Sequence, residues 1–485
     1  MEKRKKSKSG HEQIKLILGW ILTIVQLAAS VIFVVTVAFL GVLPAVLLGI
    51  LVAAAAALLI ITRLLMSRPA KKKRYYAGAV ISILLCVVLI AANFYLSKIN
   101  SVLEKVTGAT YETTLIGVYV LDEDPAQSLE DAADYDFGFL TSLGREDTDY
   151  AIEQINKRLG GEISEKSYAS MVDLADALYA GDSQAVILPD AYVDVITDTD
   201  GYETFEDDIR LLYTVQWEEE LEEADANENV FTVLISGIDT DGAISTKSRS
   251  DVNILAVVNR NTHQVQLIST PRDYYVALSI SDGVKDKLTH SGIYGVQVTM
   301  DTIGMLYDVD VDYYFRINFT GFVDLIDAMG GITVTSDVEF TSGDYTFTVG
   351  DNELDGEAAL AFVRERHAFS SGDRQRGKNQ MAVISGVISK MQTFSFLQNF
   401  NGFLTGVENS FETNIPSDLL TDMVKEQLSG GDSWNVASYS VDGTGDYATT
   451  YSMSQELYVM IPDEDTVEYA RALIEAVIAG EAAGN

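Results

Sequence analysis

Basic side chains gather in two short windows of an otherwise acidic part of the chain. After position 105 the chain holds 20 Lys and Arg against 68 Asp and Glu, and eleven of the 20 fall between 247 and 287 or between 364 and 378. Guanidinium groups bind phosphate oxygens in bidentate fashion, so this pattern predicts a site for a polyanion such as phosphate. The alternative is that Asp273, Glu365 and Asp373 simply pair with neighbouring arginines. The eleven cations are Lys247, Arg249, Arg260, Arg272, Lys285, Lys287, Arg364, Arg366, Arg374, Arg376 and Lys378.

Two aspartates lie in or beside the first window. Asp239 follows a predicted strand in SGIDTDG, and Asp251 opens the next strand in SRSDVNIL. Mg²⁺ takes few protein ligands and is commonly held by one or two carboxylates together with phosphate oxygens. The pair therefore indicates a magnesium site beside the arginines, whereas either aspartate alone would be explained by turn chemistry.

Other kinds of site have little support in the sequence. The chain has no G-x-S-x-G elbow, no GK[ST] phosphate loop and no H-E-x-x-H, and its four histidines are far apart. Asp198-x-Asp200-Gly201 hints at a calcium loop, but the spacing of an EF-hand is not met, and a solvated acidic turn is favoured.

The elements that must position these residues alternate between strands and helices. This alternation, with apolar strands, predicts an α/β domain at 230–485 in which helices cover both faces of a mixed sheet. Predicted strands cover 231–235, 253–258, 264–269, 313–319, 332–334 and 457–461; predicted helices cover 293–303, 322–329, 380–391 and 466–478.

A smaller α/β accessory domain is predicted at 107–216. Strands are expected at 114–121 and 185–188, with helices between them that end at Gly160 and Gly181. The acidic run 217–229 is predicted to be a solvated helix end or a linker between the two domains.

The first 105 residues have a different composition, with 14 Lys and Arg and 3 Asp and Glu. Apolar runs at 14–40, 42–65 and 76–96 are each long enough to cross a hydrocarbon core of ~30 Å as a helix. Cations flank the runs at 3–8 and 68–74, whereas the connection between the first two runs has none. Positive residues stay in the cytoplasm, so we expect a cytoplasmic N-terminus and an extracellular region after position 96.

The single cysteine, Cys86, lies in the third apolar run, so the predicted exterior cannot form a disulfide. The acidic exterior also argues against nucleic acid as a partner.

Six windows of the second domain resemble the LytR-CpsA-Psr family. They are GIDTDG, SRSDVNIL, STPRDYYV, KDKLTHSGIYG, FTGFVDLIDAMGGI and ALAFVRERHAFSSGDRQRGKNQ, in that order over about 230–395. Three membrane helices followed by an accessory domain resemble the streptococcal capsule-biosynthesis branch. The resemblance implies a membrane-bound phosphotransferase that attaches a polyprenyl-pyrophosphate-linked glycopolymer, such as capsular polysaccharide or wall teichoic acid, to peptidoglycan.

The resemblance also implies roles for individual residues. Asp239 and Asp251 would hold Mg²⁺, and Arg249, Asp251, Arg272 and Asp273 would act in catalysis. The pyrophosphate would be bound by Arg249, Arg272, Lys287, Arg364, Arg366, Arg376 and Gln380.

Two details of the last motif are specific to this sequence. Asn379 stands where many relatives have arginine, so that phosphate contact is expected to be weaker or supplied by Lys378. If FVRERH is extended, Arg364 and Arg366 point the same way and Glu365 points away.

Other functions remain open at this point. The exterior could be a binder or sensor of the lipid-linked polymer, or a hydrolase that uses water as the acceptor. A transcriptional regulator is excluded because the large domain is expected outside the cell.

Overall fold

The computed structural model describes residues 10–482, apart from 42, 108–110, 222–226, 239–243, 370–371, 394–395, 397–402, 404–405 and 408–409. The chain divides into two compact units, one of residues 1–105 with 416–432 and the other of residues 106–415 with 433–485.

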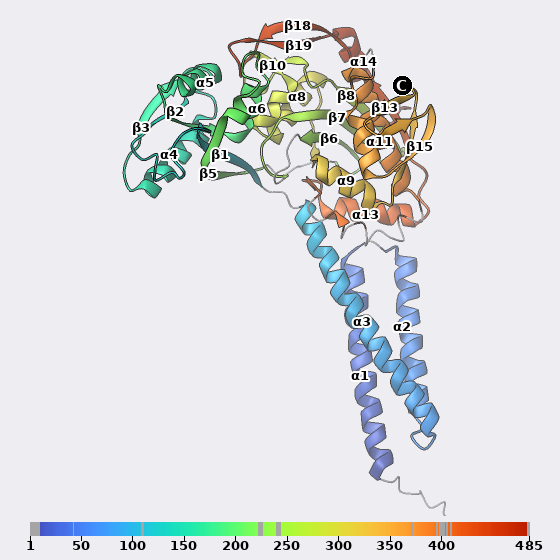
Figure 1. Cartoon of the computed structure of the whole chain (residues 1–485). Helices are drawn as coiled ribbons and strands as arrows, with labels where there is room; N and C mark the ends of the chain where they lie inside the picture. Colours follow the sequence, from blue (N-terminus) through green and yellow to red (C-terminus); the bar gives the residue numbers. More distant parts are fainter. Residues whose placement is uncertain are drawn as a thin grey trace, which may run out of the picture. The chain divides into compact units, whose positions relative to one another are not determined.

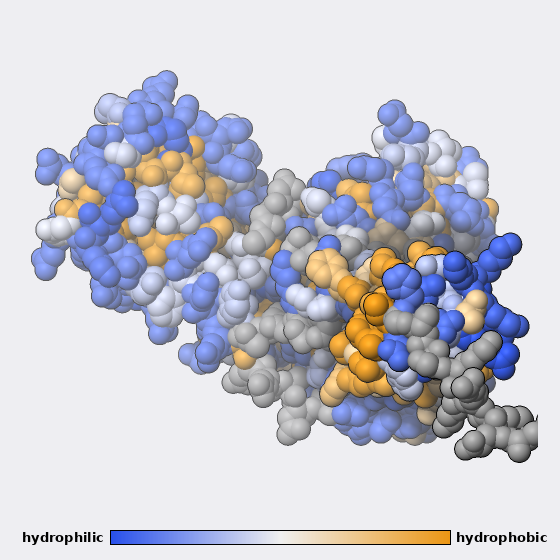
Figure 2. Space-filling model, turned by 90° about the horizontal axis from the view of Figure 1, so that it is seen from below, coloured by the Kyte–Doolittle hydropathy of each residue, from blue (hydrophilic) through white to orange (hydrophobic). Residues whose placement is uncertain are grey.

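The first unit contains three helices that are long and apolar enough to cross a membrane, as the sequence predicted. Figure 1 shows the start of α1 at the same end of this bundle as the α2–α3 connection, which agrees with the placing of the cations. In Figure 2 the surface of these three helices is strongly hydrophobic and is coloured orange. The helices of this unit are α1 (Gly10–Phe39), α2 (Ala45–Met66), α3 (Lys72–Thr107) and α13 (Ser417–Leu428).

A small polar network links these three helices. The Gln26 side-chain oxygen accepts hydrogen bonds from Thr62 Oγ1 at 2.9 Å and Ser82 Oγ at 2.8 Å, and all three side chains are buried. One residue comes from each helix, so the network fixes how the three helices are rotated against one another.

The accessory domain is a five-stranded sheet of order β3-β2-β4-β1-β5 with helices packed on it. Helices α4 and α5 end at Gly160 and Gly181, both with a φ of 73° that glycine adopts without strain, as predicted. Its elements are β1 (Tyr111–Leu121), β2 (Asp136–Leu140), α4 (Arg145–Leu159), β3 (Ser164–Tyr168), α5 (Met171–Ala180), β4 (Ala185–Pro189), α6 (Asp190–Thr197), α7 (Phe205–Asp208) and β5 (Ile209–Glu220).

The acidic run 217–229 does not begin as a linker. Its first four residues belong to β5, where Trp217 pairs with Thr114 and Glu220 with Tyr111 of β1. Trp217 also packs against Tyr150 with ring centroids 4.7 Å apart. Aromatic packing on a half-buried strand therefore outweighs the acidic composition that suggested a helix end.

The second domain is built on a six-stranded mixed sheet of order β16-β11-β6-β7-β8-β17. The β11–β6 and β8–β17 pairs are parallel, and the other neighbours are antiparallel. The strands are β6 (Val230–Ile238), β7 (Ser250–Asn259), β8 (Gln264–Thr270), β11 (Tyr313–Ile317), β16 (Phe411–Thr413) and β17 (Asn435–Ser440).

Helices cover both faces of this sheet, which confirms the predicted α/β class. On one face, Ile303 of α8 and Ile474 of α14 pack with Leu255 and Ile268 of the sheet in one buried cluster. On the other face α11 lies so close to β8 that a Cβ on Gly377 would be 2.8 Å from Ser269 Oγ. The helices are α8 (Val296–Tyr307), α9 (Phe319–Ala328), α10 (Gly356–Arg364), α11 (Asp373–Met391) and α14 (Glu464–Ile478).

The remaining elements surround the sheet as a short 3₁₀ helix and small antiparallel ladders. The predicted helix at 293–303 is in fact the end of η1 followed by α8, with Gly295 between them. These elements are η1 (Leu288–Tyr294), β9 (Tyr275–Ala277), β10 (Lys285–Lys287), β12 (Ile332–Ser336), β13 (Phe340–Ser342), β14 (Tyr345–Phe347), β15 (Gly350–Leu354), β18 (Gly443–Thr449) and β19 (Glu456–Pro462).

A buried ion cluster joins the two sheets. Arg316 of β11 binds Glu112 of β1 and Glu412 of β16, and Glu112 also accepts hydrogen bonds from the backbone N–H of Val296 at the start of α8. Arg316 and Glu112 are each 2 % exposed. One residue further along β1, Thr113 forms a parallel bridge with Thr246.

Removing the central cation of this cluster should destabilise the second unit strongly. Arg316→Ala leaves two carboxylates in a buried site, and breaking a buried pair in this way costs about 3 kcal/mol or more of the free energy of unfolding. Chemical denaturation monitored by tryptophan fluorescence measures this loss. The matched control Arg316→Met/Glu112→Gln/Glu412→Gln removes all three charges and should lose clearly less, so equal losses would contradict this account.

Candidate functional site

Asp251, at the start of β7, is the carboxylate on which the predicted arginines converge. Its Oδ2 accepts a hydrogen bond from Arg272 Nη1 at 2.8 Å, and its Oδ1 accepts one from Thr289 Oγ1 at 3.0 Å. Arg376 Nη2 donates to the backbone carbonyl of Asp251 at 3.0 Å. Residues that are up to 125 positions apart in sequence thus meet at the end of one strand.

The charges around Asp251 keep its side chain ionised. Burial by itself raises the pKa of this carboxyl, but the positive charges of Arg272, Arg249 and Arg376 outweigh burial and hold the pKa below its ordinary value. The Asp251 side chain is 15 % exposed. The site therefore brings three guanidinium groups to one ionised carboxylate, which is the kind of arrangement that binds phosphate oxygens.

Asp273 lies beside this cluster and binds a second cation. Lys287 Nζ is 2.6 Å from Asp273 Oδ1, and Arg272 Nε is 3.9 Å from Asp273 Oδ2. Arg272 consequently lies between the two aspartates predicted to act in catalysis. Lys285, the first residue of β10, is exposed and its ammonium group lies over the ring of Tyr275, so Lys287 is the lysine that joins the cluster.

Arg249 and Arg364 line one pocket of about 1110 Å³ between the accessory domain and the central domain. The accessory side comes from β1, α6, α7 and β5, and the opposite side comes from α9 and α10. We call this the accessory pocket. Its lining residues are Leu115, Tyr119, Asp190, Ala191, Val193, Asp194, Glu206, Ile209, Leu211, Thr246, Lys247, Ser248, Arg249, Phe319, Thr320, Val323, Asp324, Glu357, Leu360 and Arg364.

The accessory domain contacts Arg249 directly. Asp198 accepts a hydrogen bond from Arg249 Nη1, and Asp194 Oδ2 is 3.8 Å from Arg249 Nε. Both aspartates come from α6 or its C-terminal cap. Asp198 lies in an exposed turn, as its sequence favoured, and it also binds an arginine of the cluster.

The stretch FVRERH is not extended throughout, contrary to the condition stated for it. Arg364 is the last residue of the helix α10, and the following Glu365 has extended dihedral angles. The Arg364 guanidinium lies over the Phe319 ring, 4.3 Å from its centroid. Arg366 is exposed, its Nε bonds to His367 at 3.4 Å, and it does not line the accessory pocket.

The helix that carries the last motif begins earlier than predicted, because α11 already includes Arg374 and Arg376. Gln380 is four residues after Arg376 and shares its face of α11. Arg374 pairs instead with Asp442 at 2.6 Å. Arg376 and Gln380 thus share one face of α11, and Arg376 reaches Asp251, whereas Arg374 binds Asp442.

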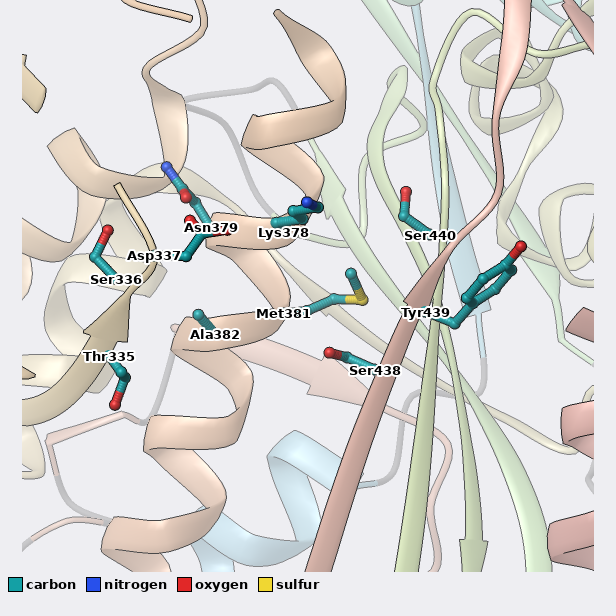
Figure 3. Close-up of a pocket in the computed structure, with 10 residues that line it drawn as sticks. All are labelled: Thr335, Ser336, Asp337, Lys378, Asn379, Met381, Ala382, Ser438, Tyr439 and Ser440. Atoms are coloured by element: carbon teal, nitrogen blue, oxygen red, sulfur yellow. The ribbon is translucent and has the colours of Figure 1, made fainter. Parts of the chain in front are cut away.

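Asn379 and Lys378 lie in surroundings different from those of Arg376: Asn379 contacts α10, and Lys378 lines a pocket beside β17. Buried Asn379 donates to the Phe362 carbonyl in α10 at 3.1 Å, so it ties α11 to the helix that ends at Arg364. Figure 3 shows Lys378 and Met381 on the side of α11 that faces Ser438–Ser440 of β17, across a pocket of about 420 Å³. Neither Asn379 nor Lys378 therefore takes the place of the expected arginine beside Asp251.

Of the two aspartates predicted to hold Mg²⁺, the structure describes only Asp251. Asp239 lies outside the described residues, although Ile238, the residue before it, pairs with Ser250, the residue before Asp251. Within the described ranges no three His, Cys, Asp or Glu side chains form a metal-binding group. An ionised Asp251 suits Mg²⁺, which needs only one or two carboxylates beside phosphate oxygens.

Sequence comparison places this cluster in a family. The chain matches the LytR_cpsA_psr family over residues 203–466, which is more than half of its length. The chain belongs to this family. The match contains every predicted site residue, whereas α6 and most of the accessory domain precede it.

Curated relatives of this LytR_cpsA_psr protein are named as transferases. It is 36% identical over 217 residues to the polyisoprenyl-teichoic acid–peptidoglycan teichoic acid transferase TagU of Bacillus subtilis, covering 44% of this chain and 69% of the relative. It is 36% identical over 195 residues to TagU of Enterococcus faecalis, covering 40% of this chain and 64% of the relative. The matched part thus spans about two thirds of the relatives' length.

Solved structures of related proteins include B. subtilis TagU, with 31% identity, a TM-score of 0.41, and coverage of 52% of this chain and 97% of that chain. TagT bound to LI-WTA has 26% identity and a TM-score of 0.42, with coverage of 53% and 94%.

Proposed function

We propose that this protein transfers a glycopolymer from a polyprenyl-pyrophosphate carrier to a peptidoglycan hydroxyl, with Mg²⁺ as cofactor. The observation that carries the proposal is the ionised Asp251 with Arg249, Arg272 and Arg376 around it, in a chain whose relatives are glycopolymer transferases. Capsular polysaccharide and wall teichoic acid are both candidate polymers at this level.

In the proposed reaction the hydroxyl oxygen attacks the phosphorus that carries the sugar. A new P–O bond forms, the P–O bond to the polyprenyl phosphate breaks, and that phosphate leaves with the electron pair. The hydroxyl proton passes to a base, for which Asp251 and Asp273 are the two candidates. The product is a phosphodiester between glycopolymer and peptidoglycan.

The residues of this site suit such a reaction because its transition state spreads negative charge over phosphate oxygens. Arg249, Arg272 and Arg376 would bind these oxygens and stabilise the charge, and Arg364 would contact the donor from the accessory pocket. Mg²⁺, held by Asp251 and Asp239, would neutralise further phosphate charge when bound.

The experiment uses the full-length protein in nanodiscs with a lipid-linked oligosaccharide, peptidoglycan fragments and Mg²⁺. The proposal expects a sugar–phosphate–peptidoglycan product and free polyprenyl phosphate. Donor binding without turnover would support the sensor alternative, and sugar phosphate released to water would support the hydrolase alternative. Either result would overturn the transfer reaction.

The depressed pKa of Asp251 predicts that protonation of this carboxylate does not limit transfer activity in mildly acidic solution. Its folded-state pKa is below the unfolded value of about 3.9, so its ionised form stabilises the fold above that pH and this contribution is lost only as the pH falls through the lower folded value. Single-turnover transfer should therefore show no acid limb from Asp251 between pH 7 and about 4.5. A limb above pH about 5 that moves in Asp251→Glu would contradict this assignment.

The reaction also requires the second unit to be outside the cell, as the flanking cations predict. A reporter enzyme that is active only outside the cytoplasm should be active when fused after Lys105. The same reporter should be silent when fused at Lys72, between α2 and α3. The opposite pattern in intact cells would place the site in the cytoplasm and remove access to peptidoglycan.

A further inference from the structure

The accessory pocket carries a charge pattern that the arginine cluster does not explain. Five carboxylates line it, against three cations. Two of these cations already have acidic partners, since Lys247 Nζ is 2.8 Å from Glu219 and Arg249 binds Asp198. The five carboxylates belong to Asp190, Asp194, Glu206, Asp324 and Glu357.

Three of the five carboxylates are open to solvent at the pocket. Glu206, Asp324 and Glu357 are exposed, and within the described part of the chain none of them takes part in an ion pair. They come from both sides of the pocket, because Glu206 is on α7 whereas Asp324 is on α9 and Glu357 on α10. A ligand in the pocket would therefore meet negative charge from two directions.

Apolar side chains lie between these carboxylates. Such surfaces suit sugar rings, because carboxylates accept hydrogen bonds from hydroxyl groups and apolar side chains pack on the C–H faces of the rings. A chain of repeating phosphates would instead be repelled by the same carboxylates. The apolar members of the lining are Leu115, Ala191, Val193, Ile209, Leu211, Phe319, Val323 and Leu360.

We propose that the accessory pocket binds the sugar residues next to the pyrophosphate of the donor, and that its carboxylates select uncharged or aminated glycans over polyol-phosphate polymers. The proposal rests on the transfer function proposed above, because Arg249 and Arg364 connect the pocket to the pyrophosphate site. It differs from what the names of the relatives indicate for their own substrates.

The accessory domain supplies three of the five carboxylates of this pocket, Asp190, Asp194 and Glu206. Helix α6, with Asp190 and Asp194, lies before the segment that matches the family. Tyr119 of β1 donates a hydrogen bond to Asp190, which fixes that carboxylate at the pocket wall. The proposed glycan preference thus combines carboxylates of the accessory domain with Asp324 and Glu357 of the central domain.

The test compares two synthetic donors that share the polyprenyl pyrophosphate, one with an uncharged oligosaccharide and one with a short polyol-phosphate chain. Equilibrium binding and transfer are measured separately with the full-length protein in nanodiscs. Wild type should bind the uncharged donor at least about 10-fold more tightly, since each unit charge about 7 Å away in water changes a dissociation constant about two- to three-fold. High salt should reduce the difference.

The variant Glu206→Gln/Asp324→Asn/Glu357→Gln should lose about 10-fold of this preference, mainly through tighter binding of the polyol-phosphate donor. The control Glu153→Gln/Glu162→Gln/Glu165→Gln changes the net charge equally at exposed positions that do not line the pocket, and should keep the preference.

Wild type that prefers the polyol-phosphate donor, or a pocket variant that behaves like the control, would overturn the proposal. A preference seen in binding without transfer of either donor would support the pocket assignment and refute the transfer function, so the two proposals fail separately.

Discussion

Asp251→Asn should abolish most of the transfer activity, with an expected loss of about a thousandfold in the single-turnover rate. The substitution keeps the size of the side chain and its hydrogen bond with Thr289, but it removes the negative charge on which Arg249, Arg272 and Arg376 converge. An amide binds Mg²⁺ more weakly than a carboxylate, and one of few protein ligands is then lost. The rate should also become nearly independent of the Mg²⁺ concentration.

The fold should survive this change, because the side chain keeps its shape and loses only the margin by which the positive charges outweigh burial. Circular dichroism and the denaturation midpoint check this point. The matched control is Asp446→Asn, an exposed residue of β18, which should leave both rate and Mg²⁺ dependence unchanged. A variant Asp251→Asn with wild-type Mg²⁺ dependence would show that the cation is held elsewhere.

Arg272→Lys should slow transfer about a hundredfold while donor binding weakens much less. Arg272 reaches Asp251 through Nη1 and approaches Asp273 through Nε, so one planar group spans both carboxylates. Lysine keeps the charge but has a single ammonium nitrogen and cannot span them. Loss of one contact that strengthens in the transition state costs ~2.7–4 kcal/mol, and it acts on turnover more than on ground-state binding.

Single-turnover rates and donor dissociation constants, measured side by side, decide this prediction. Arg374→Lys is the control, since Arg374 is an exposed cation of α11 that pairs with Asp442, away from Asp251. If the rate and the affinity of Arg272→Lys fell by the same factor, Arg272 would contribute only uniform binding.

Much of the fold follows from local pattern in the sequence. The apolar runs of α1–α3, the strands β6–β8 and the helices ended by Gly160 and Gly181 carry strong periodicity or termination signals. The edge strand β17 and the short helices α6 and α10 do not, because their patterns are brief and their partners are distant in sequence. β5 was missed for a related reason, since only pairing with β1 makes an acidic segment into a strand.

For the same reason, some residues of the site could be predicted from the sequence and others could not. Clustering of arginines in the sequence predicted Arg249, Arg272 and Arg376, and these residues do meet at Asp251. Thr289, Phe319 and Asp198 were not predicted, because each acts only through a contact across the fold. Several cations close together in the sequence can be recognised from the sequence alone. A single hydroxyl, ring or carboxylate that contacts them from a distant segment cannot.

Glu112 limits how this protein can be shortened. The residue is the second of β1, yet it also binds Arg316 in the central sheet and accepts the backbone N–H at the start of α8. A chain cut between the accessory and central domains would leave Arg316 with Glu412 alone and the start of α8 without its carboxylate. The accessory domain is therefore not a detachable module, and a lineage that lost it would have to replace Glu112 before its catalytic domain could stand alone.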